Sequence, residues 1–200
     1  MKLLMSPASP YVRKVRVLIR EMGLTDAITE QHVTTTAFNS DTSVIAANPM
    51  GKIPALVRDN APTLYDSRVI TRFLNDTHDG AFYPAARIWD TLTLEATADG
   101  IMDCAVSMAY EVRLRPENEQ SPDWVEAQWH KASRGIAAVN NRWISHLSGP
   151  LDMSHIAIAC ALSYVDFRHD TRNWRDGNDA LAAWHAAFLD RDSMQATTAA

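Results

Sequence analysis

The sequence predicts an α+β protein of two domains, a βαβ-α-ββα domain followed by an all-α helical domain. Two observations lead to this fold class. Every segment that reads as a strand lies in the first third of the chain, where short apolar runs alternate with helical patterns. After a polar stretch with a Gly and a Pro, residues 75–84 (NDTHDGAFYP), only helical patterns follow. We therefore expect domains at residues 1–77 and 87–200, joined by a linker at 78–86.

The elements of the first domain follow in the order strand, helix, strand, irregular segment or short helix, strand, strand, helix. A helix with regularly spaced apolar positions begins after the turn SPASP and ends at Gly23, a residue type common just past helix C-termini. The stretch 34–47 is too polar to assign, and the last helix begins at Ser67. The strands are predicted at residues 2–5, 28–33, 54–57 and 62–65.

The second domain is predicted to contain helices only. Pro116, Pro122 and the pair Gly149–Pro150 mark the gaps between them. The last residues, QATTAA (195–200), are small and polar, and we expect them to be frayed. The predicted helices span residues 87–112, 122–147, 153–168 and 178–189.

Composition favours a globular cytoplasmic protein. Of the 200 residues 46% are hydrophobic and 22% charged, and the net charge of −5 comes without basic clusters, which disfavours nucleic acid and anionic membranes as partners. No apolar run approaches the roughly 20 residues of a membrane span, and the N-terminal residues lack the pattern of a signal peptide. Cys104 and Cys160 fall within helical patterns, where buried core positions are favoured over a disulfide or a zinc site. We therefore expect no metal.

Two serines precede the first helix, in the segment SPASPYVRKV. Ser6 and Ser9 follow a strand and lie where the N–H groups of a helix N-terminus favour negative charge. A hydroxyl at this place either caps the helix or donates a hydrogen bond to a bound thiolate or carboxylate. With no His or Lys nearby to act as a base, neither serine is expected to be a hydrolase nucleophile.

Two further motifs lie in the second half of the first domain. In NPMGKIPALVRDN (48–60), Pro54 opens an apparently buried strand, although proline donates no hydrogen bond to a sheet. In LYDSRVI, Asp66 and Ser67 open a helix. They either form an ordinary cap or bind a zwitterion, with a carboxylate at Ser67 and an ammonium group at Asp66.

In this order the motifs resemble the N-terminal, thioredoxin-like domain of the glutathione S-transferases. LDMSHIAIACALSYVDFR and WHAAFLDRDSMQAT resemble the buried helix and the ending of that family's helical domain, so the resemblance covers essentially the whole chain. It is nearest to bacterial enzymes with Ser where related classes carry Cys or Tyr. It implies a homodimeric transferase that joins glutathione, a co-substrate rather than a tightly bound cofactor, to a small electrophile. A glutathione-dependent reductase or peroxidase without a protein thiol, and a non-catalytic binding protein, stay open.

The resemblance also assigns roles to residues of the first domain. Ser9 would be catalytic, donating its hydroxyl hydrogen to the glutathione sulfur and so favouring the thiolate. Ile53, before a cis Pro54, would pair its backbone with the cysteinyl part of glutathione, as an added strand does. The predicted glutathione site comprises Ser9, Lys52, Ile53, Pro54, Asp66 and Ser67.

The electrophile would sit over Ser9, between the domains. Its predicted contacts are Tyr11, Tyr110, Arg113 and Trp174, with Arg115 as the alternative to Arg113 for meeting an anion. Packing of the aromatic side chains and a solvated face for the arginines are the structural alternatives.

The helical domain departs from the family at one point. The family's capping box has Ser or Thr first and Asp three residues later, whereas this chain has Asp152 and His155. We expect a box in which the neutral His155 ring accepts a hydrogen bond, with Ser154 as a shifted alternative cap.

Overall fold

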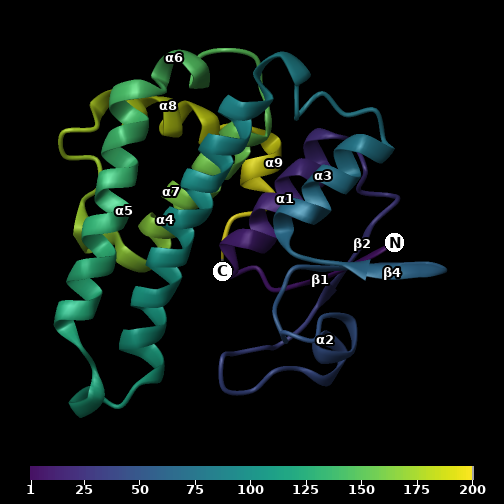
Figure 1. Ribbon diagram of the computed structural model, residues 1–200, viewed down its shortest axis with the longest axis horizontal. Coiled ribbons are helices and arrows are strands. Elements are labelled where there is room, and N and C mark those ends of the chain that lie inside the picture. Colours follow the sequence, from purple (N-terminus) through teal and green to yellow (C-terminus); the bar gives the residue numbers. More distant parts are fainter. Residues whose placement is uncertain (200) are drawn as a thin grey trace. The chain divides into compact units, whose positions relative to one another are not determined.

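The computed structural model describes residues 1–199, which form two compact units. The first unit comprises residues 1–83 together with the chain from Asp192 onward, and the second comprises Pro84–Arg191. Figure 1 shows both units and labels their α-helices and three of the four strands, β1, β2 and β4. Among the described residues, no helix combines the length and the apolar character needed to span a bilayer.

The first unit is built on a four-stranded mixed sheet. In the order β2-β1-β3-β4, β1 runs parallel to β2 and antiparallel to β3, which in turn pairs antiparallel with β4. The parallel pair requires a crossover, and the helix α1 supplies it. The strands are β1 (Lys2–Met5), β2 (Thr29–His32), β3 (Ala55–Arg58) and β4 (Ala61–Leu64).

Helices cover both faces of this sheet. α1 and α3 lie side by side on one face, and α2 lies on the other (Figure 1). Val44 of α2 packs against Leu4 and Ala55. Because neighbouring strand residues point to opposite faces, the fully buried Leu3 and Leu56 face α1 and α3. The helices of this unit are α1 (Pro10–Glu21), α2 (Thr42–Ala47), which lies in the stretch left unassigned from sequence, α3 (Ser67–Thr77) and α9 (Asp192–Gln195).

The end of the chain packs against α1. Arg13 is only 6% exposed and donates from Nη2 to the carbonyl of Met194 over 3.1 Å. Thr197 is fully buried, and the hydroxyl of Ser193 donates to Glu21. The prediction of a frayed end was therefore wrong at Thr197, because the buried guanidinium of Arg13, whose Nε lies 3.5 Å from Thr197 Oγ1, was not foreseen as a partner. Gln195, Ala196 and Thr198 are exposed. Residue 200 lies outside the described residues.

The second unit is all-helical, as predicted. α4 and α5 lie side by side and run antiparallel (Figure 1), and α7 is buried from residue 153 to 165. The helix predicted at 122–147 is interrupted at Trp143, so that α5 and α6 are separate. The α-helices are α4 (Ile88–Leu114), α5 (Pro122–Arg142), α6 (Ile144–Leu147), α7 (Met153–His169) and α8 (Asp179–Leu189), with short 3₁₀ turns at η1 (Ala85–Arg87), η2 (Glu117–Glu119) and η3 (Asp170–Arg172).

The buried carboxylate of Asp152 caps the start of α7. Its Oδ1 accepts from the Ser154 N–H over 3.0 Å, and the Asp152 N–H donates to Nδ1 of His155 over 3.2 Å. The predicted capping box of Asp152 and His155 is therefore confirmed. The Ser154 hydroxyl also donates to Oδ1, at 2.5 Å, so it assists the cap instead of replacing it.

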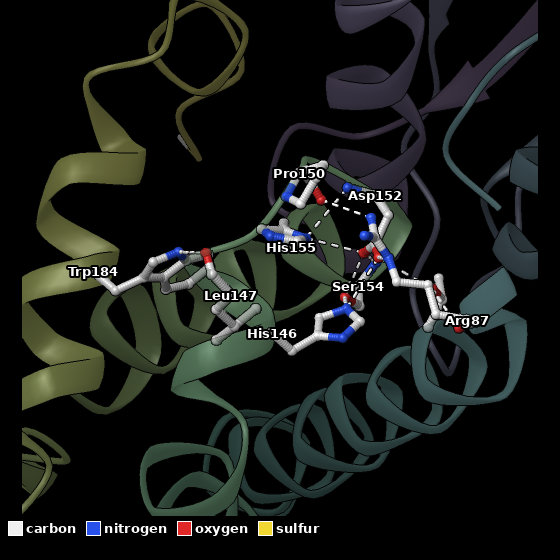
Figure 2. Close-up of polar contacts among 9 residues, drawn as sticks. Arg87, His146, Leu147, Pro150, Asp152, Ser154, His155 and Trp184 are labelled. Atoms are coloured by element: carbon white, nitrogen blue, oxygen red, sulfur yellow. Dashed lines mark hydrogen bonds and ion pairs between the residues drawn. The ribbon is translucent and has the colours of Figure 1, made fainter. Parts of the chain in front are cut away.

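Other segments of the second unit reach the second oxygen of Asp152 (Figure 2). Thr91 Oγ1 lies 3.1 Å from Oδ2, His146 Nε2 3.0 Å and Arg87 Nε 3.3 Å. Burial by itself would raise the pKa of Asp152, but the polar contacts that His155, Ser154 and His146 make with its oxygens hold that pKa well below its usual range. One carboxylate thus joins η1, α4, α6 and α7.

Replacing this carboxylate should destabilise the protein in a pH-dependent way. Asp152→Asn should lower the free energy of unfolding by about 2–4 kcal/mol at pH 7, because Asn can still cap the helix but cannot form the buried charge-assisted hydrogen bonds of the carboxylate. The Asp152 pKa is lower in the folded chain than in the unfolded one, so its stabilisation is complete above the unfolded value of 3.8 and is lost as the pH falls below it.

Urea unfolding of both proteins from pH 7 to pH 3 measures this effect. The difference in stability should shrink by about 1 kcal/mol at pH 3. A difference that stays constant over this range would contradict the proposed role of the ionised carboxylate.

Candidate functional site

Three strand ends of the first unit meet at one edge of its sheet. Leu4, next to the end of β1, pairs with Ala55 at the start of β3, and Leu56 pairs with Leu64 at the end of β4. Residues that follow β1, precede β3 and follow β4 therefore lie along the same edge. These are the segments that contain the residues predicted to bind glutathione, namely Ser9, Lys52, Ile53, Pro54, Asp66 and Ser67.

The loop before β3 is held by the buried side chain of Asn48. Its Nδ2 donates to the Lys52 carbonyl over 2.9 Å, and its Oδ1 accepts from the Met50 N–H over 3.0 Å. Gly51 has a φ of 65°, and a Cβ there would lie 2.5 Å from Ser40 Oγ, so glycine is required at this position. The shape of the loop is thus set by the residues around it. Asn48 is the first residue of the motif at 48–60, but the role of its side chain was not predicted from sequence.

Ile53 presents an open stretch of backbone beside this loop. Its N–H and its C=O make no hydrogen bond to any residue from 1 to 199. Its side chain is anchored, since it packs against the cluster that includes Leu4 and Val44. The Ile53–Pro54 peptide bond is cis, as the resemblance implied. A peptide ligand in extended conformation can pair with this backbone as an additional strand does.

Ser9 is the N-cap of α1. Its Oγ accepts from the Val12 N–H over 3.4 Å, and Pro10 occupies the first turn. A hydroxyl accepts through its oxygen and donates through its hydrogen, so capping leaves the Ser9 hydrogen available to a ligand. Among the described residues, none accepts a hydrogen bond from this hydroxyl. Ser6 lies one turn earlier, and its carbonyl accepts from the Ser9 N–H over 3.1 Å.

Asp66 and Ser67 begin α3 in two different environments. Asp66 Oδ1 accepts from the Arg68 N–H over 2.9 Å, and Oδ2 lies 3.5 Å from Arg68 Nη2, while the side chain stays 59% exposed. Ser67 is only 3% exposed, yet its hydroxyl makes no hydrogen bond within residues 1–199. The cap formed by Asp66 is therefore observed, and Ser67 keeps an unused polar group at a helix N-terminus.

The residues predicted to contact the second substrate differ in burial and in their hydrogen-bond partners. Trp174 is buried, and its Nε1 donates to Asp166 Oδ1 over 2.8 Å, so packing describes its environment. Arg115 is bound to Glu111, with Nε 3.1 Å from Oε2. We therefore do not propose Trp174 or Arg115 as contacts of the second substrate.

The other three predicted contacts are more open. Tyr11 lies half-buried on α1 in the first unit, whereas Tyr110 and Arg113 are exposed on α4 in the second. Sequence reasoning did not connect Tyr110 and Arg113 with Tyr164 and Arg168 of α7, although Tyr110, Arg113 and Arg168 all contribute to the electrostatic environment of the Tyr164 phenol. The recurrence of Tyr and Arg three or four residues apart in both helices was the available signal.

His146, Asp152 and His155 also form a cluster with the composition of a metal site. Their ligand atoms lie within 4.8 Å of one another. Those atoms already take part in the hydrogen bonds that cap α7 (Figure 2), so we assign the cluster to folding.

A βαβ-α-ββα unit joined to an all-helical unit, with a cis-proline at the sheet edge, defines a two-domain protein of the thioredoxin-like class. Comparison with protein families identifies both parts. The model of the glutathione S-transferase N-terminal domain matches residues 8–77, and that of the C-terminal domain matches residues 122–187. The chain belongs to the glutathione S-transferase family.

Relatives support this assignment along the whole chain. The uncharacterized GST-like protein YibF of Escherichia coli K12 is 32% identical over 98% of both chains. A crystal structure of a glutathione transferase family member from Pseudomonas fluorescens Pf-5 with bound glutathione is 40% identical, with a TM-score of 0.97, and the match covers 100% of this chain and 98% of that one. A structure with bound S-(propanoic acid)-glutathione, also from that organism, is 40% identical with a TM-score of 0.92 and full coverage of both chains.

Substitution of Gly51 should test how tightly the loop before β3 is built. Gly51→Ala should lower the free energy of unfolding by at least about 1 kcal/mol more than Gly23→Ala does. Both glycines have positive φ, but a Cβ at Gly23 would have no atom within 4 Å, so this second variant isolates the backbone strain. Denaturant titrations that give equal losses for both variants would show that the loop yields to the added methyl group.

Proposed function

We propose that this protein is a glutathione transferase. It binds glutathione at the sheet edge of the first unit, stabilises the thiolate, and joins the sulfur to an electrophilic carbon of a second substrate. The observation that carries the proposal is the open backbone of Ile53, fixed in place beside two helix N-termini. The glutathione bound to the P. fluorescens relative, which is similar over the whole chain, supports the same ligand here.

Each part of glutathione has a matching group. The cysteinyl backbone pairs with the N–H and C=O of Ile53. The α-carboxylate of the γ-glutamyl end accepts from the Ser67 hydroxyl and lies at the N-terminus of α3, while its ammonium group meets Asp66. The exposed Lys52 offers a cation to the glycyl carboxylate. Pro54 keeps the backbone of the loop in the conformation that presents Ile53.

Catalysis then depends on the ionisation of the thiol. A free thiol has a pKa of about 8.5 and is mostly protonated at neutral pH. A hydrogen bond donated by Ser9, together with the positive N-terminal end of α1, favours the thiolate. The thiolate attacks the electrophilic carbon and a new S–C bond forms. Either a leaving group departs with the bonding electrons, or an activated double bond takes up a proton at the neighbouring carbon.

Two other functions are the alternatives on this fold. A reductase or peroxidase would use the sulfur of glutathione itself, and a binding protein would use no chemistry. Exchange through a protein thiol is disfavoured, because burial raises the pKa of Cys104 and Cys160 is buried in α7. The S-substituted glutathione bound to a P. fluorescens relative favours conjugation. A homodimer in the cytoplasm, as the resemblance implies, completes the proposal.

Substitution of Ser9 tests the proposed function directly. Ser9→Ala should leave glutathione affinity nearly unchanged, because the groups that hold the tripeptide are untouched. The pKa of the bound thiol should rise, since the hydrogen bond to the sulfur matters more for the thiolate than for the thiol. The rate of conjugation at neutral pH should fall with it. The absorbance of the glutathione thiolate, measured as a function of pH for the wild type and the variant, gives this pKa.

Ser6→Ala is the matched control and should change the thiol pKa less. If Ser6→Ala raises that pKa and Ser9→Ala does not, the catalytic assignment is displaced by one turn. If neither variant raises it and both conjugate like the wild type, no serine side chain is catalytic. Absence of glutathione binding at millimolar concentration would reject the proposed function itself.

Substitution of Asp66 tests the zwitterion site without removing the helix cap. Asp66→Asn keeps a residue that caps α3 but removes the charge that meets the ammonium group. We expect the affinity for glutathione, measured by titration calorimetry, to fall by roughly 1.5–3 kcal/mol. Asp41→Asn, at the cap of α2, makes the same change at another helix and should not alter binding. Equal affinity of the wild type and Asp66→Asn would make Asp66 a structural cap only.

A further inference from the structure

The loop between α2 and Ile53 is anchored by a polar side chain and not by apolar packing. Within the segment 49–52, every residue that carries a side chain is exposed. Asn48, which precedes this segment, is only 4% exposed. Burial of an amide is costly unless its hydrogen bonds are made. The contacts of the Asn48 side chain therefore decide how the loop is held.

Asn48 holds both the turn and the carbonyl that follows it. Oδ1 accepts from the Met50 N–H over 3.0 Å, and the Asn48 carbonyl accepts from the Gly51 N–H over 2.8 Å, so that a tight turn forms. Nδ2 donates to the Lys52 carbonyl over 2.9 Å. From a neighbouring segment, the Thr35 hydroxyl donates to the Gly51 carbonyl over 3.3 Å. The path of the loop is thus fixed by side chains of the first unit.

A fixed Lys52 carbonyl also fixes the direction of the Ile53 N–H. Both groups belong to one peptide unit, which is planar and trans. In such a unit the C=O and the N–H point in opposite directions. Because the carbonyl points toward the buried Asn48 amide, the Ile53 N–H points away from it, and this N–H makes no hydrogen bond within residues 1–199. One side chain therefore sets the orientation of the open donor.

We propose that Asn48 is a positioning residue for glutathione: by holding the Lys52 carbonyl, its amide aims the Ile53 N–H at a carbonyl of the cysteinyl backbone. A loop that is already held in this conformation loses little freedom when the tripeptide binds, and this favours affinity. The inference rests on the proposed function, since it takes glutathione as the ligand. It concerns the binding of the tripeptide and not the ionisation of the sulfur, which is assigned to Ser9.

A second buried asparagine in the same unit provides a matched control. Asn75 of α3 is 6% exposed, and its Oδ1 accepts from the Phe82 N–H over 2.9 Å. It therefore holds the loop after α3 as Asn48 holds the loop before β3. The proposed glutathione site contains no residue of that second loop. Asn75→Ala should lower the Tm, as Asn48→Ala should, without an effect on the ligand.

Asn48→Ala should raise the Kd of glutathione by roughly fivefold to tenfold, whereas Asn75→Ala should leave it unchanged. Calorimetric titration with S-methylglutathione, whose sulfur cannot ionise, should give the same factor. In conjugation with an aryl chloride, the KM for glutathione should rise while kcat and the pKa of the bound thiol keep their wild-type values. If both variants weaken binding equally, the loss follows from destabilisation alone and the inference is wrong.

Asn48→Asp separates the two hydrogen bonds of the side chain. An ionised carboxylate still accepts from the Met50 N–H but has no hydrogen to donate to the Lys52 carbonyl. Since the inference assigns the effect to the second bond, Asn48→Asp should weaken glutathione binding at least as much as Asn48→Ala. Wild-type affinity in Asn48→Asp would show that the turn alone is sufficient, and would overturn the inference.

Amide hydrogen exchange of the wild type, followed by NMR, tests the same point without relying on a variant. In the free protein, the Met50 and Gly51 N–H groups should be protected while that of Ile53 exchanges fast. Saturating glutathione should protect Ile53 and leave the other two unchanged. If Met50 and Gly51 become protected only with glutathione, the ligand shapes the loop, and the inference fails while the proposed function stands. Absence of glutathione binding at millimolar concentration would reject both.

Discussion

The antiparallel pairing of β1 with β3 is the contact on which the rest of the first unit depends. It sets the start of β3 beside the end of β1, and the pairing of β3 with β4 extends the same alignment. Because the register places Leu4 opposite Ala55, three segments far apart in sequence come to one edge. A shift by a single residue would reverse the faces of the buried leucines, so the hydrophobic core and the position of the binding edge are fixed by the same register.

Much of this arrangement could be predicted from sequence, because it depends on local signals. β1 and β3 follow apolar runs, α1 and α3 are capped by the side chains of Ser9 and Asp66, and the box at the start of α7 follows from residues three positions apart. α2 is different: only Val44 of this helix is buried, so its sequence carries no apolar face to recognise. The interruption at Trp143 was also missed, since no proline or glycine marks it.

The residues of the candidate site also fall into two groups, those that local sequence signals predict and those that depend on the folded structure. The residues around the sheet edge could be named in advance because the chain itself sets their order and spacing. Which arginine is free to meet an anion was not named, although the sequence carried a signal, since Glu111 lies four residues before Arg115, where helical side chains meet, and only two before Arg113. Tyr164 and Arg168 come near α4 only through the packing of α7 along it, a tertiary contact that no local pattern encodes.

The docking of the last residues on α1 bears on how the protein is made. The first unit uses residues from both ends of the chain, and everything between Pro84 and Arg191 is translated before Met194 can meet Arg13. During synthesis on the ribosome, the sheet and its helices therefore lack the residues from Asp192 onward while the helical unit is translated. During that interval Arg13 lacks the Met194 carbonyl that it binds in the folded chain. The first unit is therefore completed only after the second unit has been translated.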